Sequence, residues 1–149
     1  MWNRAKLFVA GSMVVSAMLG GCGGSSTGPS PASLTGTWTA TKMEFVKAGS
    51  PATTADLVAK GATVTLDLRA SHDYTLTVKM PGQADELTTG TWSSSADMLS
   101  MTVTGFTGER QFAMNLSGNT ITLGGADVDF DFNDDGIDEP AKLSMVLTK

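Results

Sequence analysis

The stretch from Thr63 to Met80 reads TVTLDLRASHDYTLTVKM and decides the fold class. Apolar residues occupy every second position in each half of it, beginning with Val64, Leu66 and Leu68. A period of two is the pattern of a β-strand with one buried face and one solvated face. Between the halves, Ser71-His72-Asp73 has the composition of a tight turn. The stretch therefore predicts two antiparallel strands.

The same alternation recurs along the rest of the chain. Glycine, serine, asparagine and aspartate separate the alternating runs, and Gly124-Gly125 is one such predicted turn. Connections this short favour antiparallel neighbours and exclude parallel crossovers. Eight or nine strands with one apolar face each bury that face best in a small up-and-down antiparallel barrel, so we expect an all-β fold. The further runs are Leu99–Val103, Phe112–Leu116, Ile121–Leu123, Val128–Phe132 and Leu143–Leu147.

One segment departs from the period of two. Residues 52–60 carry the end signals of a helix. Ser50 can cap its start, Pro51 suits its first turn, and Gly61 suits its end. This pattern predicts one short helix of about two turns between the first two strands, where it could cover one end of the barrel.

Composition narrows the class of protein. Of 149 residues, 41% are hydrophobic and only 17% are charged, which is typical of a globular domain and not of a disordered chain or a coiled coil. Ten basic residues against fifteen acidic ones give a net charge of −5, which argues against a nucleic-acid partner. The single cysteine, Cys22, excludes an internal disulfide and a multi-cysteine zinc site.

The N-terminus has the layout of a signal peptide. Arg4 and Lys6 precede the uncharged apolar run Leu7–Leu19. As a helix this run would be roughly 20 Å long, short of the roughly 30 Å hydrocarbon core of a bilayer. We therefore predict a signal peptide over residues 1–21 and no permanent transmembrane helix.

The run Leu19-Gly20-Gly21-Cys22 resembles the lipobox of bacterial lipoproteins. The resemblance implies that the peptide is cut before Cys22 and that this residue carries acyl chains such as palmitate, which anchor the protein in a membrane. A secretory signal with a chance cysteine is the alternative. Loss of Arg4 and Lys6 would leave eight basic residues against fifteen acidic ones, a net charge of −7.

The residue after the cysteine bears on localisation. Gly23 stands where an aspartate would resemble the inner-membrane retention signal of enteric bacteria, so the resemblance implies a cell-envelope protein of the outer membrane, on its periplasmic side or at the cell surface. A Gram-positive source would instead place it on the outer face of the only membrane. Residues 22–33 are rich in glycine, serine and proline and predict a flexible tether, so the folded domain should span 34–149.

The run Leu34-Thr35-Gly36-Thr37-Trp38 resembles the Gly-x-Trp opening of lipocalin-like domains. The resemblance implies structural roles for Gly36 and Trp38, with the tryptophan closing the barrel floor. A second Gly90-Thr91-Trp92 opens a later strand, and residues 130–141 resemble the last hairpin of such domains in bacterial lipoproteins. The Thr-Asp-Tyr motif and late arginine of secreted lipocalins are missing.

Enzyme chemistry has no visible carrier in this sequence. His72 is the only histidine, and the side chains of consecutive Ser71, His72 and Asp73 cannot converge as a catalytic triad. Lipid would consume the thiol of Cys22. We therefore expect a protein that is not an enzyme.

The C-terminal acidic segment suggests a metal site. Asp131-x-Asn133-x-Asp135-Gly136 matches the first half of a calcium loop, although Lys142 at the twelfth position excludes an EF-hand. Plain hairpin-turn chemistry is the alternative. The predicted Ca²⁺ ligands are Asp131, Asn133, Asp135, the carbonyl of Ile137 and Glu139.

The barrel interior suggests two functions. Flexible methionines and leucines can line a cavity for a small apolar ligand, which would make the protein a non-enzymatic binding module. The same side chains can fill an ordinary core, which would make it a structural or interaction protein that acts on an envelope protein through its surface. The residues expected to line a cavity are Leu66, Leu76, Leu99, Met114 and Leu147.

Overall fold

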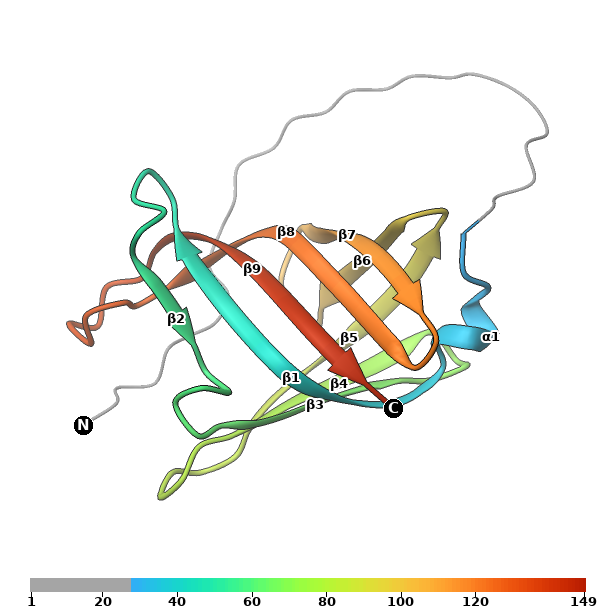
Figure 1. Cartoon of the computed structure of the whole chain (residues 1–149), viewed down its shortest axis with the longest axis horizontal. Coiled ribbons are helices and arrows are strands. Elements are labelled where there is room, and N and C mark those ends of the chain that lie inside the picture. The colour runs from blue at the N-terminus through green and yellow to red at the C-terminus, as the bar shows by residue number, and fades with distance from the viewer. Residues whose placement is uncertain (1–27) are drawn as a thin grey trace.

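The computed structural model describes residues 28–149, which form nine antiparallel strands and one short helix. Each strand pairs with the next around the sheet, and β1 also pairs with β9, so eight strands close into a barrel with β2 as an extra strand beside β1 (Figure 1). The all-β barrel prediction is confirmed. The elements are α1 (Pro31–Leu34), β1 (Gly36–Lys47), β2 (Thr54–Asp56), β3 (Thr63–Leu68), β4 (Asp73–Lys79), β5 (Glu86–Ser95), β6 (Met98–Val103), β7 (Glu109–Ser117), β8 (Thr120–Phe130) and β9 (Glu139–Thr148).

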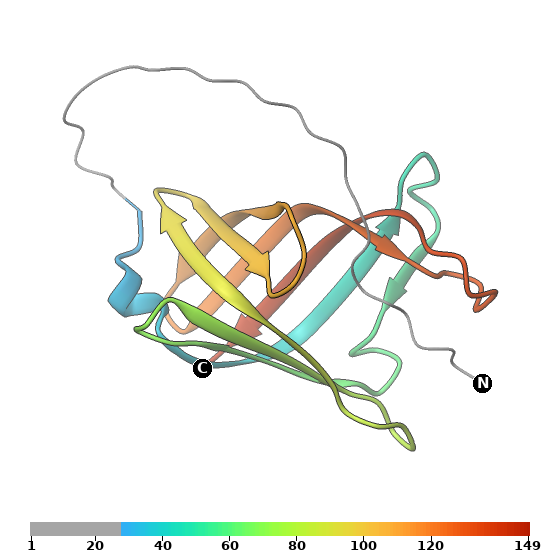
Figure 2. The same ribbon diagram turned by 180° about the vertical axis from the view of Figure 1, so that it is seen from behind.

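The connections alternate between two ends of the barrel because neighbouring strands run in opposite directions. The helix end holds α1, the β3–β4, β5–β6 and β7–β8 turns and the C-terminus (Figure 1). The loop end holds the β1–β3 connection that contains β2, together with the β4–β5, β6–β7 and β8–β9 connections. Seen from behind, α1 and the β8–β9 loop again lie at opposite ends (Figure 2).

The inward faces of the barrel strands form one continuous apolar core. In β3 the burial alternates as the sequence predicts, with Val64, Leu66 and Leu68 inside. Aromatic residues stand toward both ends of this core. Trp38 is 1% exposed near the helix end, and toward the loop end the rings of Phe45 and Phe130 stack with their centroids 4.1 Å apart. Buried aromatic side chains therefore lie toward both ends of the barrel interior.

The predicted turn at Gly124-Gly125 is wrong. A single strand, β8, runs through both glycines, and its pairing with β9 shifts register between Leu123 and Ala126. Gly125 has a φ of 81°, which glycine adopts without the strain that a side chain would cause. The two glycines therefore form a β-bulge that bends a long strand, and do not join two short ones.

The predicted helix over residues 51–60 is also wrong. Thr54–Asp56 forms β2 instead, and only a single turn follows it. The Asp56 carboxylate accepts the backbone N–H of Val58 at 3.0 Å, so Asp56 caps this turn where Ser50 was expected to cap a longer helix. Gly61, with a φ of 94°, ends the turn where the sequence predicts a helix terminus.

The short helix of this fold lies before the barrel and not within it. α1 begins at Pro31, inside the segment 22–33 that the sequence predicts as a tether, and the Ser33 N–H points at the Ser30 hydroxyl at 3.4 Å. Of that segment, the structure describes residues 28–33. Across residues 28–149, no helix combines the length and the apolar character needed to cross a bilayer.

Candidate functional site

The Gly-x-Trp segment joins α1 to the helix end of the barrel. Trp38 donates its Nε1–H to the Leu34 carbonyl at 2.7 Å, and Lys149 Nζ lies 4.3 Å from the centroid of the Trp38 ring. The same ammonium donates to the Thr35 carbonyl at 2.6 Å. A Cβ on Gly36 would lie 3.0 Å from Lys149 Cε, so glycine leaves the room that this lysine occupies.

The second Gly-Thr-Trp run repeats part of this arrangement. Trp92 is 3% exposed and donates its Nε1–H to the Arg69 carbonyl at 3.1 Å, within the β3–β4 turn. His72 lies in the same turn, with its ring centroid 5.2 Å from that of Trp92 and its Nδ1 3.2 Å from the Trp92 carbonyl oxygen. The structure therefore places His72 in a turn packed on a tryptophan.

All five residues predicted to line a ligand cavity lie together on the inward face of the barrel. Leu66, Leu99 and Leu147 expose none of their surface, and Leu76 and Met114 expose 4% and 5%. A side chain with no exposed surface touches no space large enough for a water molecule. The interior around the three leucines is therefore filled.

Tyr74 and Arg110 are polar side chains on the inward face of the barrel. Tyr74 is 2% exposed, and its burial raises its pKa to about 12. Arg110, half-buried on β7, carries a charge that opposes this rise, and burial lowers the pKa of Arg110 itself. A Cβ on Gly90 would lie 2.8 Å from the Tyr74 ring and 1.8 Å from the Thr102 carbonyl oxygen, so only glycine fits beneath this tyrosine.

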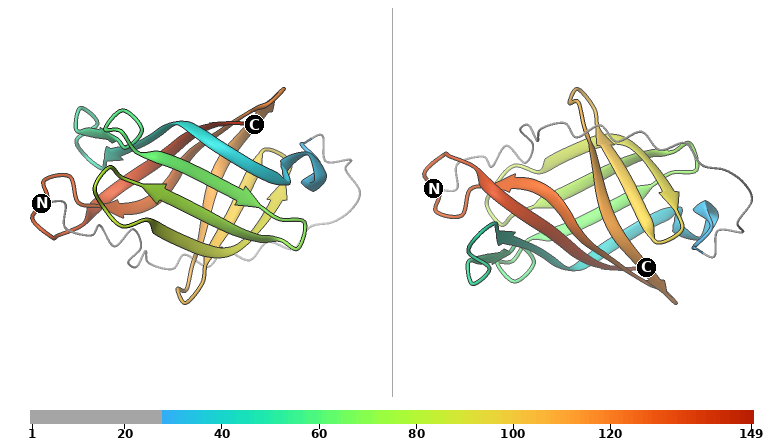
Figure 3. Two further views of the ribbon diagram at one scale, coloured as in Figure 1. Left: turned by 90° about the horizontal axis from the view of Figure 1, so that it is seen from below. Right: turned by 90° about the horizontal axis from the view of Figure 1, so that it is seen from above.

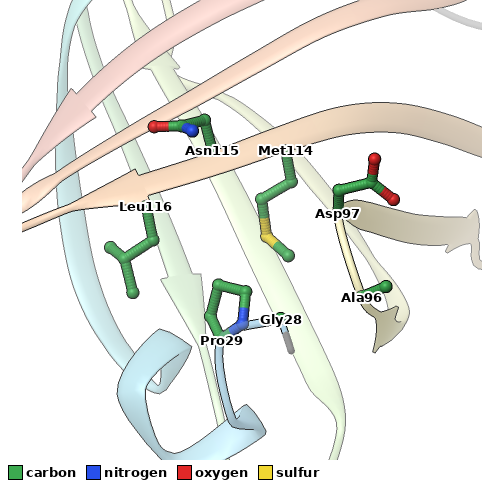
Figure 4. Close-up of a pocket in the computed structure, with 7 residues that line it drawn as sticks. All are labelled: Gly28, Pro29, Ala96, Asp97, Met114, Asn115 and Leu116. Carbon is green, nitrogen blue, oxygen red and sulfur yellow. The ribbon is translucent and has the colours of Figure 1, made fainter. Parts of the chain in front are cut away.

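A surface pocket of about 440 Å³ lies at the helix end (Figure 4). The Met114 side chain reaches toward Pro29 across it, and Leu116 lies beside them. Of the five predicted ligand residues, Met114 lines this pocket. The other lining residues are Gly28, Ala96, Asp97 and Asn115.

The predicted calcium loop is organised by hydrogen bonds from its own backbone. Asp131 is only 4% exposed and accepts N–H groups from Gly136 at 2.8 Å, Asn133 at 3.2 Å and Asp135 at 3.3 Å. Burial acts to raise the pKa of Asp131, but the backbone donors outweigh it, so the pKa is lowered. The carboxylate that opens the predicted ligand set therefore shapes the turn.

Asp135 and Glu139 also accept hydrogen bonds at this loop. Asp135 accepts the Ile137 N–H at 2.8 Å and the side-chain amide of Asn133 at 2.9 Å. Glu139 forms an ion pair with Lys47 and accepts the Phe132 N–H at 3.1 Å. The hydrogen bond from Lys47 is the main reason that the pKa of Glu139 is lowered.

The structure does not bring these carboxylates to one point. Within residues 28–149, no three Asp, Glu, His or Cys side chains are arranged to hold a metal ion. The five residues share a loop and the end of a strand, and calcium binding stays a prediction from the sequence. The lipidation site Cys22 and the signal peptide lie outside the described residues.

The structure is a small closed antiparallel barrel whose first strand begins with the Gly-x-Trp run. A family model described as a lipocalin-like domain matches residues 34–123, more than half of the chain. The protein therefore belongs to the lipocalin-like domain family, as the Gly-x-Trp resemblance implies. Neither the curated proteins nor the solved structures include a match to this chain.

Proposed function

We propose that this protein is a membrane-anchored lipoprotein of the bacterial cell envelope, without enzyme activity, whose lipocalin-like barrel acts on another envelope protein through its surface. The observation that carries this proposal is the filled interior: Leu66, Leu99 and Leu147 expose no surface that a small ligand could contact. The lipobox-like run ending at Cys22 supports the anchor, and Gly23 supports the outer membrane.

The point where the chain enters the barrel supports an orientation. The chain reaches the fold at Pro29 and α1, at the helix end. Seven residue steps from Cys22 to Pro29 span at most about 25 Å when fully extended. An anchor on Cys22 therefore holds the helix end near the membrane, and the loop end faces away from it.

The distribution of charge agrees with this orientation. Bacterial membrane surfaces are commonly anionic and repel acidic surfaces. The loop-end connections 48–62, 80–85, 104–108 and 131–138 contain six acidic residues and one basic residue, a net of −5. The helix-end turns and the last residue contain Arg69 and Lys149 against Asp97. The acidic residues at the loop end are Asp56, Asp85, Asp131, Asp134, Asp135 and Asp138, and the basic one is Lys60.

Fractionation tests the anchor. Replacing Cys22→Ser removes the thiol that the acyl chains require, so the protein should move from the membrane fraction to the soluble or uncleaved pool. Wild type should release only with detergent. A Cys22→Ser protein that is still processed, acylated and membrane-bound contradicts the anchor, whatever the barrel does.

A second candidate function is the binding of a small apolar ligand, and the pocket beside Met114 favours it. Methyl-labelled methionine reports on this site, because Met114 borders the pocket while Met43 is fully buried elsewhere. Octanoate should then shift the Met114 methyl resonance saturably and leave Met43 unchanged. Equal, non-saturating shifts of both methyls count against a ligand site there.

A further inference from the structure

On one side of the bulge in β8, this strand and its neighbour β7 are not paired with each other. β7 and β8 pair only where residues 113–117 face residues 120–124. In the part of the chain that the structure describes, β7 residues 109–112 pair with β6 alone, and β8 residues 126–130 pair with β9 alone. The two strands diverge from the helix end in the views from below and from above (Figure 3). Two short strand edges therefore face each other across a wedge.

The direction of the β8 backbone groups follows from its partner strand. The Pro140 carbonyl accepts the Ala48 N–H at 2.8 Å, so the backbone of Pro140 faces β1 and not β8. Successive residues of an antiparallel strand direct their N–H and C=O groups to alternate sides. Because Asp129 faces Pro140 in the register, its N–H and C=O point away from β9, into the wedge. Those of Asp127 do the same.

The β7 edge can be oriented by the same reasoning. Met114 donates its N–H to the Asp97 carbonyl at 2.6 Å, so the backbone of Met114 faces the β6 side. Alternation then directs the N–H and C=O groups of Gln111 and Glu109 toward β8. The wedge thus presents donors and acceptors from four residues, two on each edge.

The side chains around the wedge specify the chemistry of an occupant. Glu109 and Asp127 are exposed and Asp129 is half-buried on the outward face, while Gln111 is neutral. Lys142 pairs with Asp127 at 2.6 Å but belongs to β9. The inward positions of the β8 edge are apolar, as at Val128. A strand in the wedge would meet acidic groups on its outer face. On its inner face it would meet apolar side chains of β8 and the half-buried Arg110 of β7, whose charge interacts with Asp129.

We propose that the wedge between β7 and β8 binds an extended, basic segment of a partner protein by strand addition, with main-chain hydrogen bonds to Asp127 and Asp129. This deepens the proposed function and rests on it, because it names the surface and the chemistry of the envelope partner. Strand addition gives affinity through the backbone and selectivity through alternating side chains. Lysine or arginine at every second position complements the acidic outer face.

A synthetic peptide tests the proposal on the full chain in detergent. The probe is a blocked heptapeptide that alternates lysine and valine. It should bind saturably and shift the backbone amide resonances of Gln111, Asp127 and Asp129. The same peptide N-methylated at alternate residues keeps the charge but loses the donors of one edge, and should bind about tenfold more weakly. A glutamate–valine peptide should not bind.

A pair of variants separates the backbone from the charge. Asp129→Pro removes the N–H that points into the wedge and leaves the β8–β9 hydrogen bonds intact, so it should weaken binding of the lysine–valine peptide about tenfold. Asp129→Ala removes only the carboxylate and should weaken binding about threefold. Circular dichroism establishes that both variants fold.

Three results would overturn the inference. Equal affinities of the parent and N-methylated peptides would mean that charge alone attracts the probe. Amide shifts away from β7 and β8 would place the site elsewhere, and this result from the wild-type chain holds even if Asp129→Pro does not fold. Absence of binding would exclude strand addition. None of these results depends on the anchor, so failure of the proposed function is recognised separately by the fractionation of Cys22→Ser.

Discussion

At the residue scale, Trp38 connects the N-terminal helix to the barrel. The indole is 1% exposed, bonded to the Leu34 carbonyl and covered by Lys149. Trp38→Ala should lower the free energy of unfolding by about 3–5 kcal/mol, as for other buried aromatic residues. Urea unfolding in a Cys22→Ser background measures this loss. Lys149→Ala, which keeps the indole buried, should cost much less, and equal losses would refute the role given to the tryptophan.

The acidic loop should make stability depend on pH. The folded pKa values of Asp131 and Glu139 lie below their unfolded values, which are near 3.9 and 4.3. Their contribution to stability is therefore present above those values and is lost as the pH falls through them toward the folded values. Melting temperatures between pH 7 and pH 3 should decline most steeply below about pH 4.5.

A variant separates the loop from the other acids. Asp131→Asn loses the charge that accepts three backbone N–H groups, so it should melt at a lower temperature at pH 7 and should show a shallower decline with acid. Asp127→Asn, on an exposed side chain, is the matched control. If the decline of Asp131→Asn is as steep as that of wild type, the acid response comes from other groups.

At the scale of the elements, Gly90 in β5 packs directly against the backbone of β6. A Cβ there would lie 1.8 Å from the Thr102 carbonyl oxygen, a backbone atom that cannot move aside. Gly90→Ala should therefore lower the free energy of unfolding by about 3 kcal/mol or prevent folding. Gly124→Ala is the control, because its Cβ would come no closer than 3.7 Å to its nearest neighbour. Similar losses for both variants would contradict the close approach.

The acidic loop also provides the test of the calcium prediction. If Ca²⁺ binds there, millimolar Ca²⁺ should raise the melting temperature more than equal Mg²⁺ does, and Asp135→Ala should abolish the difference. The carboxylates of Asp131 and Asp135 already accept hydrogen bonds from the backbone N–H groups of this turn. Equal responses to the two ions would therefore leave the acids as turn-forming residues only.

The local sequence pattern predicts some of these elements correctly and others incorrectly. Alternation places Val64, Leu66 and Leu68 inside correctly, because a strand with one buried face admits no other period. Gly124-Gly125 has turn composition, but pairing of β8 with β9 on both sides of it makes a bulge. The helical signals over 51–60 are outweighed by pairing of β2 with β1, since two helical turns alone bury little surface.

At the scale of the whole molecule, the sequence predicts the closed barrel and the family but not the state of the interior. Leu66 and Leu147 carry the same apolar signal whether they line a cavity or fill a core, so only packing decides. The sequence does not predict the wedge between β7 and β8 either, because the divergence of two strands depends on their register. The polar run Glu109-Arg110-Gln111 gives no sign of which neighbouring strand it lacks.

A titration with a fluorescent fatty acid distinguishes a filled barrel that acts through its surface from an open barrel that carries a ligand. With Leu66, Leu99 and Leu147 fully buried, the probe should show no saturable binding to the full chain, and unlabelled fatty acid should displace nothing. Saturable uptake of one probe per chain, reversed by unlabelled fatty acid and without a shift of the Met114 methyl resonance, would contradict the filled interior and make the protein a carrier of apolar ligands.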